Sequence, residues 1–191
     1  MDQGAIGELR LVQYQQEGFA EQIAWRTSVA ATGGGVLIDG GIHAVNAIVN
    51  IGGLPTEVFA AVPPKTLDTE GEDGIVVILR LPGGVVGLLN YSSATPGAGL
   101  TRWLNVTGTK GQVRHGPFAR EMTIRTNEGD ETIALPDEGR GSRTIVREFR
   151  DAISEDREPV MSGEEGLADL AEVLAAYRSA EMGALVAVSL D

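Results

Sequence analysis

The sequence contains no cysteine and few basic residues. Without cysteine, disulfides and thiolate metal sites are excluded, and the composition does not indicate whether the protein works in an oxidising or a reducing compartment. The 15 lysine and arginine residues stand against 27 aspartate and glutamate residues, which gives a formal net charge of −12 at pH 7. Nucleic acids and anionic membrane surfaces both select proteins with basic patches, so this balance argues against either as a partner.

Long apolar runs and a targeting segment are also lacking. No uninterrupted apolar stretch reaches the roughly 20 residues of a membrane-spanning helix. The first residues, Met1-Asp2-Gln3-Gly4, do not resemble a signal peptide. Hydrophobic residues make up 42% of the chain and charged residues 22%, as in an ordinary globular domain. We therefore expect one soluble, cytoplasmic domain over residues 1–191.

The hydrophobic pattern predicts both strands and helices. Residues 7–16 alternate apolar and polar side chains, as a half-buried strand does. A mostly apolar segment at residues 36–51, followed by Gly52-Gly53, predicts a buried helix. Further strands are predicted at residues 57–62, 74–81, 85–93, 102–107, 112–115, 122–126 and 131–135, with an edge strand at residues 184–190.

Two helices are predicted near the end of the chain. Apolar residues at helical spacing, from Ile145 to Ile153, predict the first of them. Ser162 and Glu165 form a capping box at the start of the second, which should end near Gly183. Because the strands follow one another through short turns, we expect an α+β fold with a mostly antiparallel sheet of about six strands and the helices packed on one face.

The other face of that sheet should be open and partly apolar. Val76, Ile78, Val86 and Leu88 alternate with residues that face the helices. An exposed apolar face indicates an interface, so we expect a homodimer or tetramer through it.

One segment combines residue types that suit proton transfer. Asp39 and His43 lie four residues apart, so on a helix they share a face, and Asn46 follows near it. Histidine titrates near neutral pH, and an adjacent carboxylate can orient the ring or hold it protonated. A local surface interaction is the competing interpretation. The apolar flanks favour function, because buried polar groups are costly unless partnered, and Gly40-Gly41 suggests that something approaches the backbone closely.

The run GGGVLIDGGIHAVN at residues 33–46 resembles the signature of the glucose–fructose oxidoreductase/inositol dehydrogenase/rhizopine-catabolism (Gfo/Idh/MocA) family. In that signature a glycine cluster precedes Asp, Gly and His, with an acidic residue three positions further on. Motifs elsewhere resemble the same family in the same order, over nearly the whole chain: GAIGE at residues 4–8, Trp25-Arg26, GTKGQV at residues 108–113, GEEGL at residues 163–167 and AYRSA at residues 176–180.

The resemblance implies the substrate-binding half of an oxidoreductase that passes a hydride between NAD or NADP and a sugar, polyol or related hydroxy compound. His43 matches the histidine that relays the hydroxyl proton. Asp39 matches the aspartate that binds a substrate hydroxyl and tunes that histidine. The chain departs from the family in two ways: Asn46 replaces the acidic residue, and the family's catalytic lysine has no counterpart before the signature.

A nucleotide-binding Rossmann domain is not expected in this chain. The pattern Gly-x-Gly-x-x-Gly fails from Gly33 because position 38 is Ile, and no predicted strand precedes it. We therefore expect no cofactor and no metal on this chain alone, and the Rossmann domain as its missing partner. The chain would then be an excised piece, a truncated gene product or one half of a split enzyme.

Three further residues are candidates for substrate binding, namely Trp25, Arg26 and Tyr91, alongside Asn46. For each, packing is the competing interpretation. We expect the side chains of Asp39 and His43 to project into one shared cleft, open near residues 1–7. The alternative function is a non-catalytic module of the same fold that oligomerises or binds a ligand or partner.

Overall fold

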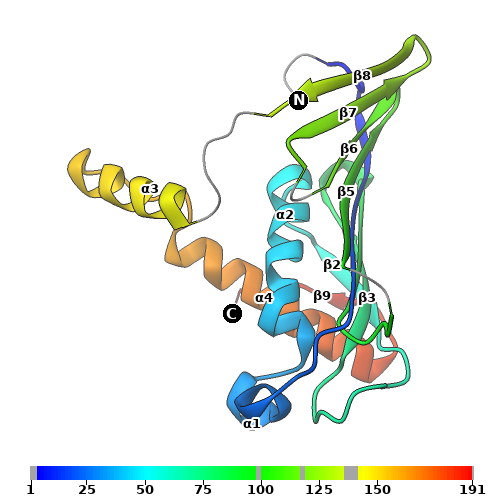
Figure 1. Ribbon diagram of the computed structural model, residues 1–191, viewed down its shortest axis with the longest axis vertical. Helices are drawn as coiled ribbons and strands as arrows, with labels where there is room; N and C mark the ends of the chain where they lie inside the picture. Colours follow the sequence, from blue (N-terminus) through cyan, green and yellow to red (C-terminus); the bar gives the residue numbers. More distant parts are fainter. Residues whose placement is uncertain (1–3, 98–99, 117–118, 136–141, 191) are drawn as a thin grey trace.

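The computed structural model describes residues 4–97, 100–116, 119–135 and 142–190. One mixed sheet runs through the molecule, and Figure 1 shows it nearly edge-on with the helices to its left. Its strand order is β8-β7-β6-β5-β1-β4-β3-β2-β9. The strands are β1 (Leu9–Glu17), β2 (Glu57–Ala61), β3 (Gly74–Arg80), β4 (Val86–Ser92), β5 (Thr101–Gly108), β6 (Gly111–His115), β7 (Glu121–Thr126), β8 (Gly129–Ala134) and β9 (Val186–Ala187).

The sheet is larger and less uniform than the sequence predicted. Nine strands are found in the described part of the chain instead of about six. All neighbours pair antiparallel except β1 and β4, which run parallel with Leu11 beside Val86. A parallel pair needs a long crossover, and the segment between β1 and β4 supplies it with a helix and a returning hairpin. The central position of β1 joins the β2–β4 meander to the β5–β8 meander.

The helical segments are η1 (Ala24–Thr27), α1 (Val29–Thr32), η2 (Leu37–Gly41), α2 (Ile42–Gly52), η3 (Pro82–Gly84), α3 (Ser142–Ser154) and α4 (Gly163–Met182). The predicted helix at residues 36–51 is confirmed, but its first turn, η2, is a π-helix. The capping box of α4 is also confirmed, with Ser162 and Glu165 each accepting from the other's backbone N–H.

The apolar core lies where α2 and α4 cover β1 to β4, and includes Val12, Leu37, Ile48, Leu79, Leu89 and Val173.

The glycine cluster before α2 lets two chain segments approach its backbone. A Cβ on Gly35 would lie 2.1 Å from the carbonyl oxygen of Glu72, and one on Gly34 would lie 2.4 Å from the Tyr177 hydroxyl. The Glu72 carboxylate accepts from the Leu37 N–H at 2.8 Å, and the Tyr177 hydroxyl accepts from the Gly35 N–H at 3.2 Å. These amides at the start of the helix therefore have protein partners.

By length and composition, the helical stretch Val29–Gly52 could cross a membrane, with a mean hydropathy of 1.3. This is weak evidence, because a helix that packs in a core has the same composition. Here Leu37, Val45 and Ile48 are buried against the sheet. The sequence-based search missed the stretch because polar residues and glycines interrupt it.

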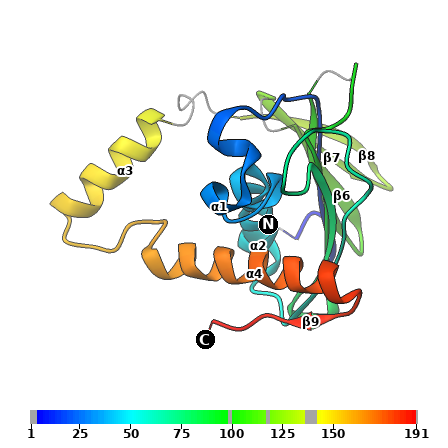
Figure 2. The same ribbon diagram turned by 90° about the horizontal axis from the view of Figure 1, so that it is seen from below.

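Helix α3 stands away from the sheet, whereas we had expected both C-terminal helices to pack on it. Figures 1 and 2 show α3 projecting from the body beyond the start of α4. Its apolar side chains Ile145, Val146, Phe149 and Ile153 are 64–69% exposed. Helical spacing predicts that a helix has an apolar face, but it does not specify what covers that face.

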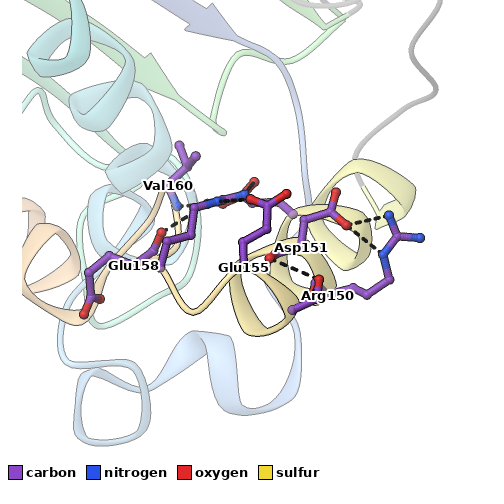
Figure 3. Close-up of polar contacts among 8 residues, drawn as sticks. Arg150, Asp151, Glu155, Glu158 and Val160 are labelled. Carbon is purple, nitrogen blue, oxygen red and sulfur yellow. Dashed lines mark hydrogen bonds and ion pairs between the residues drawn. The ribbon is translucent and has the colours of Figure 1, made fainter.

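Polar contacts fix the turn between α3 and α4 (Figure 3). Arg157 donates two hydrogen bonds to the Glu148 carboxylate of α3, at 2.7 and 3.0 Å, and a third to Glu155 at 2.7 Å. The Val160 N–H donates to the same Glu148 carboxylate at 2.9 Å. Arg157 thus ties the last turns of α3 to the start of the connection.

The face of the sheet opposite α2 and α4 is partly apolar, as predicted. Val76, Ile78 and Val86 are 37–42% exposed on it. Their neighbours Val77 and Leu79 point to the core and are 1% exposed, which is the period-two alternation of a strand. Figure 1 shows no helix over this face in the described part of the chain.

Candidate functional site

A cavity of about 390 Å³ lies where the parallel strands β1 and β4 end. Because β5 begins opposite the end of β1, three strands meet at this edge. The segment after β1, η1 and η2 close the remaining sides. The polar lining includes Gln16 of β1, Arg26 of η1, Asp39 of η2, Tyr91 and Ser92 of β4, and Arg102 of β5.

Asp39 and Arg26 form an ion pair inside this cavity. The Arg26 Nε lies 3.0 and 3.2 Å from the two carboxylate oxygens of Asp39. The Arg26 guanidinium also stacks on Trp25, 4.8 Å from the ring centre. Both side chains of the pair are partly exposed, so the pair contributes little stability. Of the predicted pair Trp25 and Arg26, only Arg26 lines the cavity, and Trp25 contacts it through its ring.

Tyr91 is a buried member of the cavity wall, 7% exposed, as is its neighbour Gln16 at 8%. Its hydroxyl would lie 2.5 Å from a Cβ on Gly40, so the glycine makes room for it. The close approach that Gly40 suggested in the sequence is therefore made by a protein side chain. Burial raises the pKa of Tyr91, the hydrogen bond with Gln16 and the charge of Arg102 lower it, and the charge of Asp39 raises it. Tyr91 thus remains a neutral hydrogen-bonding group at neutral pH.

His43 lies outside the lining of this cavity. It is exposed on α2, and the expectation that it would share one cleft with Asp39 is wrong. Asp39 lies in the π-helical turn η2, and His43 lies in the first turn of α2. Asp39 is turned toward Arg26 of η1, whereas His43 lies on the side of α2 that carries Asn46 and approaches α4.

The opening toward residues 1–7 is also not found. The cavity lies at the Glu17 end of β1, whereas Ile6 pairs with Lys110 beyond the other end of that strand. A nine-residue strand separates its ends by roughly 26 Å. Residues 1–3 lie outside the described residues. The error came from assuming that the start of the chain marks the side on which a second domain approaches.

Asn46 faces α4 instead of the cavity. Its Nδ2 donates to both carboxylate oxygens of Asp169, at 3.0 and 3.3 Å. Asp169 also interacts electrostatically with His43. The predicted residues therefore form two groups: Asp39, Arg26 and Tyr91 at the cavity, and His43 with Asn46 beside α4.

Sequence reasoning missed Gln16, Arg102, Asp169 and Glu172. A signal was present for the last two. Asp169 and Glu172 fall on the face of α4 that also carries the buried residues Ala176 and Ser179, so both acids interrupt a buried stripe. Among the described residues, no group of three His, Asp or Glu side chains could hold a metal ion.

Parts of the sequence are similar to a known protein family and to proteins of known activity. A family model described as the GFO/IDH/MocA C-terminal domain matches residues 1–114. Trans-1,2-dihydrobenzene-1,2-diol dehydrogenase of Oryctolagus cuniculus is 34% identical over 110 residues, covering 57% of this chain and 32% of that protein. The 1,5-anhydro-D-fructose reductase of Ensifer adhaerens is 27% identical over 166 residues, covering 83% of this chain and 49% of that protein. The chain thus spans a third to a half of these relatives.

Solved structures resemble almost the whole chain. A levoglucosan dehydrogenase in complex with NADH and levoglucosan superposes with a TM-score of 0.86 at 17% identity, over 100% of this chain and 62% of that one. An aldose–aldose oxidoreductase from Caulobacter crescentus, complexed with glycerol, gives a TM-score of 0.84 at 26% identity, over 97% of this chain and 57% of that one. About two-fifths of each solved chain lies outside the similarity.

Proposed function

The chain belongs to the GFO/IDH/MocA family, and we propose that it is the substrate-binding and proton-relaying part of a nicotinamide-dependent oxidoreductase that acts on a sugar or polyol. The observation that carries the proposal is the cavity, in which Asp39, Tyr91 and Gln16 offer carboxylate, hydroxyl and amide groups to a hydroxylated ligand. Two of its relatives are named for reactions on a diol and an anhydro sugar.

In this proposal the cavity residues bind and orient the substrate. Asp39 accepts a hydrogen bond from a substrate hydroxyl, and Arg26 keeps the carboxylate in place. Tyr91 and Gln16 hold a second hydroxyl at the buried end of the cavity. The lining charges, Arg26 and Arg102 against Asp39 and Glu21, cancel formally, which suits a neutral polyhydroxylated ligand.

The described residues do not fit a dinucleotide. The backbone N–H groups of the glycine cluster donate to Val29, Thr32 and Tyr177, and that of Leu37 donates to Glu72, so they are not available to phosphates. The chain also lacks the glycine pattern that follows the first strand of a Rossmann domain. NAD or NADP would therefore be held by a separate Rossmann domain, and no step through it is assigned to the residues of this chain.

We propose that the exposed face of α3 packs against that nucleotide-binding domain. The levoglucosan dehydrogenase superposes on all of this chain, α3 included, and about two-fifths of its own length lies outside the superposition. The four exposed apolar side chains of α3 form one stripe, and Val160 and Met161 in the following turn are exposed as well. The Glu148–Arg157 contacts join α3 to the connection that leads into α4.

His43 is assigned the proton relay, acting on a hydroxyl presented at the rim of the cavity once the nucleotide-binding domain has closed over it. In a full-length protein, His43→Ala should lower kcat by a factor of about 10²–10⁴, as expected for a lost general acid–base. Because His43 is exposed, its loss should leave the unfolding free energy within about 0.5 kcal/mol of the wild type. Turnover of polyols and thermal unfolding are the measurements, with His115→Ala as the control.

Two observations favour the alternative, a non-catalytic oligomerisation or ligand-binding module. Asp39 is already paired with Arg26, and His43 does not line the cavity. If His43→Ala retains the kcat of the wild type while ligand binding persists, this second function replaces the first.

A further inference from the structure

Two carboxyl side chains of α4 lie buried beside the part of α2 that bears His43. Asp169 is 6% exposed and Glu172 is 2% exposed. They are three residues apart on the helix, so their side chains lie on the same face, about one turn apart. Neither residue lines the cavity, and the proposed substrate contacts do not use them.

Hydrogen bonds fix the first of these carboxylates against α2. Asn46 donates to both oxygens of Asp169, and the Asn46 Oδ1 accepts from the Asn50 side chain at 2.8 Å. The amide therefore has its NH₂ group toward the carboxylate and its oxygen away from it. His43 lies three residues before Asn46, on the same side of α2, and interacts electrostatically with Asp169.

The second carboxyl has no hydrogen-bond partner for either oxygen within the described residues. Burial, and then the charge of Asp169, raise the pKa of Glu172 to about 8. Burial also raises the pKa of Asp169, which Asn46 and His43 lower and Glu165 raises. At neutral pH Glu172 is thus mostly protonated, and only Asp169 of the pair carries a negative charge.

We propose that Asp169 is a positioning residue for His43, and that it supplies from α4 the carboxylate that the resembling signature carries at position 46 of α2. The inference rests on the proposed function, in which His43 relays the substrate proton. Glu172, protonated and buried behind Asp169, keeps a second negative charge away from that carboxylate. When Glu172 ionises, the charge next to Asp169 changes and the environment of His43 changes with it.

The first experiment needs no turnover. A chain without a histidine tag has two histidines, His43 and His115. The ring signals of both are followed by NMR from about pH 7 to about pH 9, across the ionisation of Glu172. His43 should show an inflection near the pH of about 8 at which Glu172 titrates, and His115 should not. The inflection should vanish in Glu172→Gln and weaken in Asp169→Asn.

An identical His43 curve in the wild type and in Glu172→Gln would overturn the link between the acid pair and His43. Glu181→Gln, an exposed position on the same helix, is the matched control and should leave the curve unchanged. Should Asp169→Asn fail to fold, the exchanged double variant Asn46→Asp with Asp169→Asn keeps one carboxylate and one amide in contact and takes its place.

The second experiment measures turnover in a full-length protein. Asp169→Asn should lower kcat by about 10- to 100-fold through misplacement of His43, with KM within about 3-fold. The exchanged double variant should recover kcat to within about 3-fold, because the carboxylate moves to the other side of the same hydrogen bond. Glu172→Gln should keep the wild-type kcat at neutral pH. The wild-type kcat should change near pH 8, where Glu172 ionises, and the kcat of Glu172→Gln should not.

The two experiments separate this inference from the proposed function. A normal kcat in Asp169→Asn, combined with an inactive His43→Ala, overturns the positioning role and leaves the proposed function standing. A normal kcat in His43→Ala overturns both, and an NMR inflection would then describe a contact without a role in turnover.

Discussion

At the scale of single residues, the buried Glu172 makes the stability of this chain depend on pH. Its carboxyl is 2% exposed, and its pKa in the folded chain is about 8, above the ordinary value of 4.5. The folded state therefore binds more protons than the unfolded state between these two values. The stability that this proton provides is complete below about pH 4.5 and is lost as pH rises through about 8.

We expect the unfolding free energy of the wild type to fall with rising pH in that window, by up to about 1.4 kcal/mol per pH unit from this group. Glu172→Gln cannot ionise, so its profile should be flatter and should exceed the wild type at alkaline pH. Urea unfolding followed by circular dichroism at a series of pH values measures this difference. The exposed Glu181→Gln is the control, and parallel profiles for the wild type and Glu172→Gln would contradict the expectation.

Asp39, His43 and Gly40 show which features of the site the sequence motif predicted and which it did not. The spacing of Asp39 and His43 predicted a shared helix, and both lie on one continuous helical stretch. It did not predict the π-turn, because a helix of either type satisfies the same apolar pattern. Close packing with Tyr91 explains the glycine at position 40, and a sequence does not show which distant side chain fills such a gap.

At the scale of elements, α3 differs from the other long helices because its apolar face is exposed. Helices α2 and α4 bury apolar side chains against the sheet. Helix α3 leaves Phe149 and Ile153 64–67% exposed, and the contacts between Glu148 and Arg157 join it to the connection before α4. An exposed apolar stripe of this kind is expected of a docking element.

In the chain alone, Phe149→Ser should change the unfolding free energy by less than about 0.5 kcal/mol, because the ring is mostly exposed. Ile48→Ala, in the buried face of α2, should cost about 2–5 kcal/mol. In a full-length protein, Phe149→Ser should lower the Tm, because the docked ring would be buried there. Thermal unfolding of both forms measures this pair of effects. A cost in the chain alone as large as that of Ile48→Ala would show that α3 packs against the body in solution.

At the scale of the whole molecule, the open face of the sheet divides into two parts. The part on β3 and β4 is apolar, with Val76, Ile78 and Val86 exposed. The part on β5 and β6 is polar and aromatic, with the Arg114 guanidinium 5.4 Å from the centre of the Trp103 ring. An exposed apolar patch next to an arginine and an aromatic ring has the composition of a protein interface.

We therefore propose that copies of the chain associate through this face. Ile78→Glu should convert a dimer or tetramer into a monomer in sedimentation velocity, because it places a charge inside the buried patch. Leu54→Glu, which changes an exposed leucine in the segment that follows α2, should leave the assembly unchanged. A wild-type chain that sediments as a monomer at high concentration would rule the interface out.

The sequence by itself determined the α+β class, most strands, the helix at residues 36–51 and the capped start of α4. Each of these follows from local rules: side-chain alternation, helical spacing, glycine stops and a capping box. It also pointed to the family through short motifs, and the match over residues 1–114 bears this out. Local rules act over a few residues, so they work without knowledge of the tertiary structure.

Only the tertiary structure decided which residues meet. The parallel pairing of β1 with β4, the outward placement of α3, and the absence of His43 from the cavity that Asp39 lines depend on contacts between distant segments. The Asn46–Asp169 contact joins residues 123 positions apart. No periodicity encodes such a pair, because it arises from the way α2 and α4 cross over the same sheet.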